Sequence, residues 1–114
     1  SIIRFDENAI LATKRFTSSL VDPRKATMVY NTLYELTKGK TNRKALMCAL
    51  RAAIDARVMI RPPYNDFIEV FGCGDILSKE QYSQYTSPKY KGYMNYELYK
   101  SALRKFRAIK NLAI

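Results

Sequence analysis

Three consecutive residues, Gly39, Lys40 and Thr41, match the end of the loop that holds phosphate groups in many nucleotide-binding proteins. The complete loop reads G-x-x-x-x-G-K-[ST] and follows a strand. Here Tyr34 stands in place of the first glycine, and the residues before the triplet predict a helix. The sequence therefore argues against a nucleotide triphosphatase and favours a turn between two helices at this point.

The residue types that most often carry out catalysis are scarce. The chain has no histidine, which removes the commonest general base and metal ligand. Cys48 and Cys73 lie too far apart for zinc-site spacing. A metal-dependent nuclease could use mid-chain carboxylates with a lysine, and the chain has four of them: Asp66, Glu69, Asp75 and Glu80. Because nothing in the sequence fixes their geometry, we predict a non-enzyme without a cofactor or a metal.

Cations gather where the helix after the Gly39–Thr41 turn would begin. Thr41 suits the cap of this helix, and Lys40, Arg43 and Lys44 surround its first turn. Helix N-termini disfavour cations by roughly 0.3–1 kcal/mol each, whereas a bound anion would reverse that balance. The Thr41 hydroxyl and the Asn42 amide could also donate to a DNA phosphate or a base edge. The alternative is that exposed lysine and arginine tolerate these positions without a function.

Tyrosines concentrate near the C-terminal end. Six of the nine fall between residues 82 and 99, interleaved with Lys89 and Lys91: Tyr82, Tyr85, Tyr90, Tyr93, Tyr96 and Tyr99. Aromatic faces beside cations suit the stacking of unpaired bases. Tyrosine is also a common packing and interface residue with a polar tip. Both interpretations stay open at this point.

Apolar periodicity and capping residues indicate the elements that must position these groups. They predict helices at about 6–20, 23–38, 42–57, 79–85 and 96–112. The second is the clearest, because Asp22 can cap it, Pro23 suits its first position and Gly39 its end. The third is apolar over more than half of its circumference, so we expect it at the centre of the fold. Ser78 and Gln81 predict a capping box for the fourth.

The last predicted helix has two distinct sides. Asn95 is its expected cap, and its apolar side carries Leu98, Ala102, Phe106, Ile109 and Leu112. The other side carries cations at helical spacing, namely Lys100, Arg104 and Arg107, with Lys105 and Lys110 beside them. Such a stripe can follow a phosphate backbone. It could also contact an acidic protein or stay hydrated, and a membrane ranks last because no aromatic-rich insertion face accompanies it.

The segment 58–71 changes character. β-branched residues on either side of turn residues at 62–66 favour a β-hairpin. The alternative is a loop followed by a short helix capped by Asn65 or Asp66. With a hairpin, the order of elements over about residues 6–71 resembles a winged-helix domain. That resemblance implies a major-groove position for Asn42, Arg43, Lys44, Met47 and Arg51, and a wing that carries Arg61 and Tyr64.

The overall charge indicates the class of partner. The 114 residues carry a net charge of +10, with +5 over residues 39–63, −3 over 64–86 and +6 over 87–114. Two basic zones therefore flank an acidic stretch, a pattern that favours an anion-binding face over a merely soluble surface. No apolar run is long enough to cross a membrane. Two cysteines are too few for a disulfide framework, so we expect an intracellular setting in the cytoplasm, the nucleus or a virion.

Together these patterns predict one mainly α domain over residues 1–114. It has about five helices, a helix-turn-helix-like pair and a winged-helix-like hairpin at 58–71. We expect it to bind nucleic acid, DNA rather than RNA, in a regulatory, replication-accessory or packaging role. The alternative is a viral or phage structural or adaptor protein that uses the Tyr82–Tyr99 segment to bind itself or another protein. The residues predicted to contact nucleic acid are Lys40, Thr41, Asn42, Arg43, Lys44, Arg51, Arg61, Lys89, Lys91, Lys100, Arg104, Arg107 and Lys110.

Overall fold

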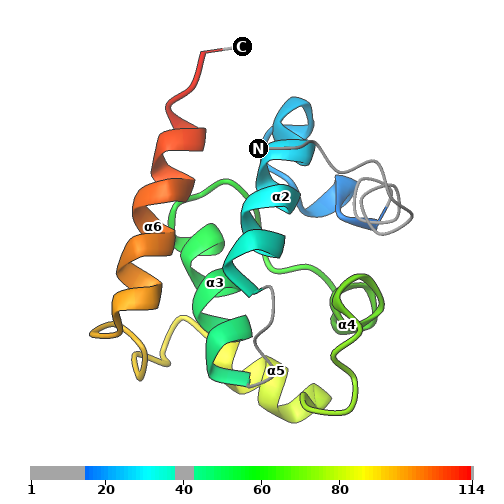
Figure 1. Ribbon diagram of the computed structural model, residues 1–114. Helices are drawn as coiled ribbons and strands as arrows, with labels where there is room; N and C mark the ends of the chain where they lie inside the picture. The colour runs from blue at the N-terminus through cyan, green and yellow to red at the C-terminus, as the bar shows by residue number, and fades with distance from the viewer. Residues whose placement is uncertain (1–14, 38–42, 114) are drawn as a thin grey trace.

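The computed structural model describes residues 15–37 and 43–113, which fold into helices arranged around α3 (Figure 1). Their order is η1 (Thr17–Ser19), η2 (Pro23–Lys25), α2 (Ala26–Thr37), α3 (Arg43–Asp55), α4 (Tyr64–Phe71), α5 (Lys79–Thr86) and α6 (Glu97–Lys110). The prediction of a mainly helical fold with about five helices is confirmed. The expected helix at 6–20 and the turn at Gly39 lie largely outside the described residues, and the described end of the former is the 3-10 turn η1.

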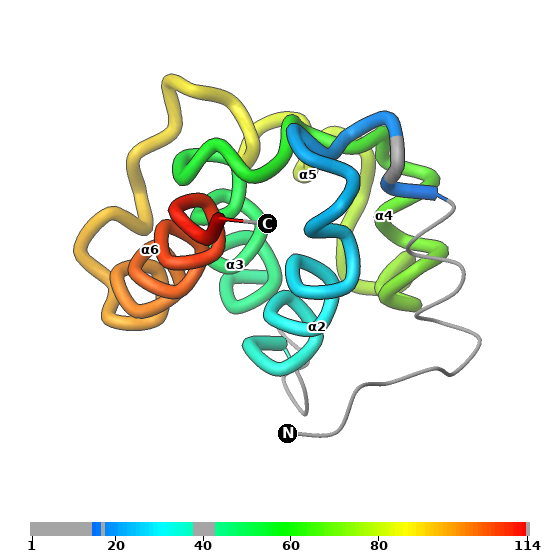
Figure 2. Tube along the Cα trace, turned by 90° about the horizontal axis from the view of Figure 1, so that it is seen from above, coloured from blue at the N-terminus to red at the C-terminus, as the bar shows by residue number. Residues whose placement is uncertain are grey.

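The central helix is α3, which lies between α2 and α6 in both views (Figures 1 and 2). Its small or apolar side chains make this position favourable, and Ala49, Leu50 and Ala53 are all 0% exposed. From α6, Ala102 and Phe106 meet this surface and are equally buried. Burial of a side chain as large as phenylalanine contributes about 1.5–3 kcal/mol. Both α3 and α6 run from bottom to top in Figure 1, whereas α2 runs the opposite way.

Local capping fixes several helix starts as the sequence predicted. Asp22 caps the turn that leads into α2, and its Oδ1 accepts from the backbone N–H of Arg24 at 3.1 Å. Ser78 and Gln81 form the expected capping box at the start of α5. Each of these bonds satisfies a backbone or side-chain group that an uncapped helix end would leave without a partner.

The two ends of α6 differ from expectation. Its N-cap residue is Tyr96, which makes no side-chain cap bond, so the prediction of Asn95 as the cap is wrong by one residue. At the other end, Lys25 is only 8% exposed. Its Nζ donates to the backbone oxygen of Lys110 at 3.0 Å, which joins η2 to the last turn of α6.

The predicted β-hairpin at 58–71 is wrong, and with it the winged-helix resemblance. Within the described residues, β-pairing amounts to an isolated antiparallel bridge between Leu20 and Met59. After the two prolines the chain forms α4, with Pro63 as its N-cap. The alternative of a loop and a short helix is therefore correct, although neither Asn65 nor Asp66 caps it. Burial of Phe67 and Val70 outweighs the strand preference of β-branched residues.

A left-handed residue ends α3. Arg57 has φ 64°, and it is the non-glycine residue with positive φ among those described. The N–H of Arg57 donates to the Ile54 oxygen at 3.0 Å, and the N–H of Val58 donates to the Ala53 oxygen at 3.2 Å. These two bonds form a Schellman motif, whose left-handed position is usually glycine. Gly72 occupies the equivalent place after α4, with φ 62°.

We predict that Arg57→Gly raises the free energy of unfolding by about 0.5–1 kcal/mol. Glycine removes the cost of about 1–2 kcal/mol that a side chain adds to the left-handed conformation. Part of this gain is offset because glycine also increases the conformational entropy of the unfolded chain. Urea denaturation measures the change. The control is Arg61→Gly, which replaces an exposed arginine in the irregular segment before α4 and should not stabilise the protein. Equal effects of the two substitutions would show that the left-handed backbone at Arg57 carries no strain.

Candidate nucleic-acid interface

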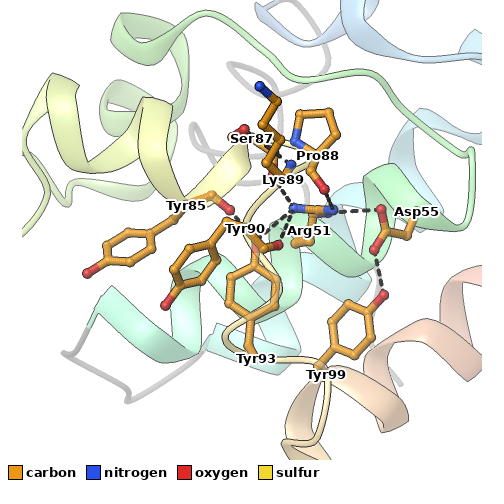
Figure 3. A network of polar contacts seen from close by, with 9 residues as sticks. All are labelled: Arg51, Asp55, Tyr85, Ser87, Pro88, Lys89, Tyr90, Tyr93 and Tyr99. Carbon is orange, nitrogen blue, oxygen red and sulfur yellow. Dashed lines mark hydrogen bonds and ion pairs between the residues drawn. The ribbon is translucent and has the colours of Figure 1, made fainter.

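Arg51 lies inside the protein and not on its exposed surface. The residue is 3% exposed. Its Nε donates to Asp55 Oδ1 at 2.9 Å, and the rest of the guanidinium donates to the hydroxyl of Tyr93 and to three backbone oxygens, those of Ser87, Pro88 and Tyr90 (Figure 3). Its predicted role as a phosphate ligand is therefore not available to it. Met47, which the winged-helix resemblance also places near the major groove of DNA, is 1% exposed.

The Arg51 contacts neutralise the one carboxylate of α3. Burial alone would lower the pKa of the Arg51 guanidinium, but hydrogen bonds with Asp55 and Tyr93 raise it, so the group stays charged. The second oxygen of the Asp55 carboxylate accepts from the hydroxyl of Tyr99 on α6. Asp55 therefore acts within an internal network and contributes little repulsion toward an external anion.

Three of the six tyrosines in the tyrosine-rich segment serve packing. Tyr82, Tyr93 and Tyr99 are each 5% exposed or less. Rings follow one another from Tyr85 through Tyr90 and Tyr93 to Tyr99, with centroid separations of 5.0, 5.1 and 5.8 Å. Burial raises the pKa of the Tyr93 hydroxyl to about 12. These three residues form part of the core and are not an external binding surface.

The cations of α6 lie on its exposed side. Phe106 and Ile109 are buried against the core, while five cations of the same helix are exposed: Lys100, Arg104, Lys105, Arg107 and Lys110. The predicted two-sidedness is thus present, except that Leu112 is 49% exposed beyond the end of the helix. Arg104 pairs with Glu97 at 3.5 Å, and both side chains are mostly exposed. Such a pair contributes about 0–1 kcal/mol and can exchange for another anion.

Two acidic residues, Asp66 and Glu69, lie on the other side of the molecule. Asp66 and Glu69 belong to α4, and both pair with Arg15, at 3.8 and 3.2 Å. In Figure 1 and Figure 2, α4 and α6 lie on opposite sides of α2 and α3. The two α4 carboxylates are therefore separated in space from the cations of α6.

A second group of cations lies near the start of α6. Because α3 and α6 run in the same direction, Arg43 and Lys44 at the start of α3 lie close to Tyr96. The Nζ of Lys44 is 3.5 Å from the centre of the Tyr96 ring. Lys89 and Lys91 are exposed in the connection between α5 and α6. The predicted ligands Lys40, Thr41 and Asn42 lie outside the described residues.

The C-terminal ends of α3 and α6 border a groove of about 580 Å³. Arg57, Arg61 and Lys110 line it together with Val21 and Ile60, which are 50% and 60% exposed. Arg61 and Lys110 are among the residues predicted from the sequence to contact nucleic acid, whereas Arg57, Val21 and Ile60 are not. No local pattern could have found them, because Val21 reaches this groove through the bridge between Leu20 and Met59.

The described residues offer no metal centre or reactive thiol. Within 15–37 and 43–113, no three His, Cys, Asp or Glu side chains are grouped closely enough to hold a metal ion. Cys48 and Cys73 are free and buried, and burial raises the pKa of each thiol to about 11. Both are therefore protonated at neutral pH and poor nucleophiles. In the same part of the chain, no helix has the length and apolar character needed to cross a bilayer.

No protein-family model, curated protein or solved structure matches the chain.

We predict that Arg51→Leu lowers the free energy of unfolding by about 3 kcal/mol, because it leaves Asp55 and buried carbonyl oxygens without their cationic partner. Arg104→Leu is the matched control. It removes the same charge from an exposed position and should change stability by less than about 0.5 kcal/mol. Urea denaturation of both variants measures the difference. A loss at Arg51 no larger than at Arg104 would mean that the 87–93 connection is held by other contacts.

Proposed function

We propose that the protein binds nucleic acid through the exposed cations of α6 and those at its two ends. The observation that carries this proposal is the spatial separation of charge. The α4 carboxylates Asp66 and Glu69 are engaged by Arg15, and no described ion pair joins them to α6. Lys100, Lys105 and Arg107 make no ion pair with the described residues and remain exposed, so they are available to an external polyanion.

The helix supplies a row of charges that suits a phosphate backbone. Lys100 and Lys110 are ten positions apart, which corresponds to about 15 Å along a helix. That length covers roughly four phosphates of one DNA strand. Binding would release counterions condensed on the nucleic acid, so its affinity should fall steeply as the salt concentration rises. A surface that is merely hydrated would show no such binding.

We predict that Lys100→Gln with Arg107→Gln reduces the magnitude of the salt slope, log Kd against log salt, by about 2, because each phosphate contact contributes about 0.9. Anisotropy titrations of labelled single-stranded DNA, duplex DNA and RNA between about 50 and 200 mM salt would measure it. The control Arg15→Gln with Lys79→Gln removes the same charge on the α4–α5 side and should leave the slope unchanged. Absence of binding by the unmodified protein at low salt, or equal losses in both variants, would overturn the proposal.

A second candidate function is protein binding at the groove beside Val21 and Ile60. Their exposure favours it, because aliphatic side chains offer no ring for base stacking. With Arg57 and Arg61 in the same lining, the groove suits an acidic peptide that carries aliphatic side chains. The burial of Tyr82, Tyr93 and Tyr99 argues against the tyrosine-rich segment as the interface.

We predict that Ile60→Ser weakens binding of a labelled acidic, leucine-containing peptide by about tenfold, which corresponds to the loss of one partly buried aliphatic contact. The variant with Lys100→Gln and Arg107→Gln serves as the control and should bind the peptide as the unmodified protein does. Fluorescence anisotropy gives both affinities. Equal binding of the peptide by the unmodified protein and by Ile60→Ser, or binding by neither of these two, would exclude this second function.

A further inference from the structure

We infer that the pocket between the starts of α3 and α6 binds one unpaired nucleobase, which would make the protein selective for single-stranded or unpaired nucleic acid. The inference rests on the proposed function and identifies the ligand of one part of the same surface. The pocket has a volume of about 290 Å³. That is the lower end of the range for ligand pockets, roughly 300–1,000 Å³, and suits one flat ring system. Its lining residues are Arg43, Lys44, Met47, Tyr85, Tyr90, Tyr93 and Tyr96.

The lining selects a flat ligand with negative charge nearby. Tyr85, Tyr90 and Tyr96 provide aromatic surface, over a floor formed by the buried side chains of Met47 and Tyr93. An aromatic pocket alone could also hold a quaternary ammonium group. The two cations of the lining, Arg43 and Lys44, oppose a cationic ligand and favour one attached to a phosphate.

Tyr96 occupies a position that helix formation does not explain. It is the N-cap residue of α6 and makes no side-chain cap bond, although Ser, Thr, Asp or Asn there would contribute about 1 kcal/mol. The hydroxyls of Tyr82, Tyr93 and Tyr99 are bound to internal acceptors, as expected for packing residues. Tyr96 is instead 38% exposed, with Lys44 over its ring. A tyrosine that leaves the helix uncapped and its ring accessible is suited to stack on a base.

Gly92 leaves room for the Tyr90 ring. A Cβ atom at this glycine would lie 2.5 Å from Cζ of Tyr90, closer than real contacts allow. Arg51 holds the backbone oxygen of Tyr90 from inside the protein. Figure 3 shows the rings of Tyr85 and Tyr90 directed away from Arg51. The backbone that carries the Tyr90 ring is therefore held in place before any ligand arrives. In a complex the base lies on Tyr96, and Lys44 moves to the adjacent phosphate.

The test uses single-stranded DNA that contains one 2-aminopurine, whose fluorescence falls when it stacks, and a duplex of the same length. We predict that Tyr96→Leu weakens single-strand binding by about 5- to 100-fold, the range for loss of one stacked base, and abolishes the fluorescence change. Tyr96→Phe keeps the ring and should bind within about twofold of the unmodified protein. Duplex affinity should be the same in all three proteins. Gly92→Ala displaces Tyr90 and should reproduce part of the Tyr96→Leu loss.

The outcomes separate this inference from the proposed function. If Tyr96→Leu binds single strands as the unmodified protein does, while loss of Lys100 and Arg107 weakens binding, the pocket holds no base and the basic surface stands alone. An equal loss of duplex binding in Tyr96→Leu would also overturn the inference. Failure of the unmodified protein to bind any oligonucleotide at low salt would end both. Circular dichroism identifies a variant that fails to fold. If Tyr96→Leu does not fold, Gly92→Ala tests the inference: weaker single-strand binding supports it, and unchanged binding overturns it.

Discussion

The arrangement of the C-terminal half depends on the burial of one guanidinium. Removing a charge from water costs several kcal/mol unless its hydrogen bonds are replaced. An arginine has five N–H donors in a fixed planar fork. Arg51 satisfies them with Asp55, Tyr93 and the backbone oxygens of the connection between α5 and α6. That connection must therefore curve around a single point beside α3, and its path determines where α6 begins and where Tyr90 and Tyr96 stand.

The distribution of charge follows from the same packing. Because α3 is buried around most of its circumference, it can accommodate a charge only where a complete set of partners exists, and Arg51 uses that place. The other described cations lie at helix ends, in 3-10 turns and connections, or on the outer side of α6. The part of the acidic segment that forms α4 lies on the far side of the molecule from α6, whereas α5 packs against α3. The α4 carboxylates Asp66 and Glu69 are thereby separated from α6 by the core, while Glu97, on α6 itself, pairs with Arg104.

Features that depend on residues close together in the sequence were predicted well, and features that depend on residues far apart in the sequence were not. The periodicity of α3 and α6 and the capping residues Asp22 and Ser78 act within a few positions, so the sequence reveals them directly. The prediction for segment 58–71 is wrong because its extended part pairs only at one bridge, between Met59 and Leu20, and the rest of the segment packs into the core as α4. Arg51 and Asp55, four residues apart on a helix, have the spacing of an ordinary surface pair. Only the fold brings carbonyl oxygens from residues 87–90 onto that arginine. The tyrosine pocket likewise joins residues some 50 positions apart, such as Lys44 and Tyr96, so no local pattern indicates it.

Two helix ends on the basic side of the molecule depart from the usual capping rules. On the acidic side, α4 ends at a left-handed glycine, Gly72, and α5 begins with a complete capping box, so both termini follow the rules of local stability. On the basic side, α3 ends at a left-handed arginine, Arg57, and α6 begins at an uncapped tyrosine, Tyr96. Each of these two helix ends costs about 1 kcal/mol relative to a glycine or a capping residue. The side chains of Arg57 and Tyr96 each line a cavity that cationic side chains also line. Proteins tolerate local strain mainly where a site requires it. The anion binding proposed for the α3–α6 pair would account for the positions of Arg57 and Tyr96 beside cations, while the start of α4 at Pro63 also lacks a side-chain cap bond.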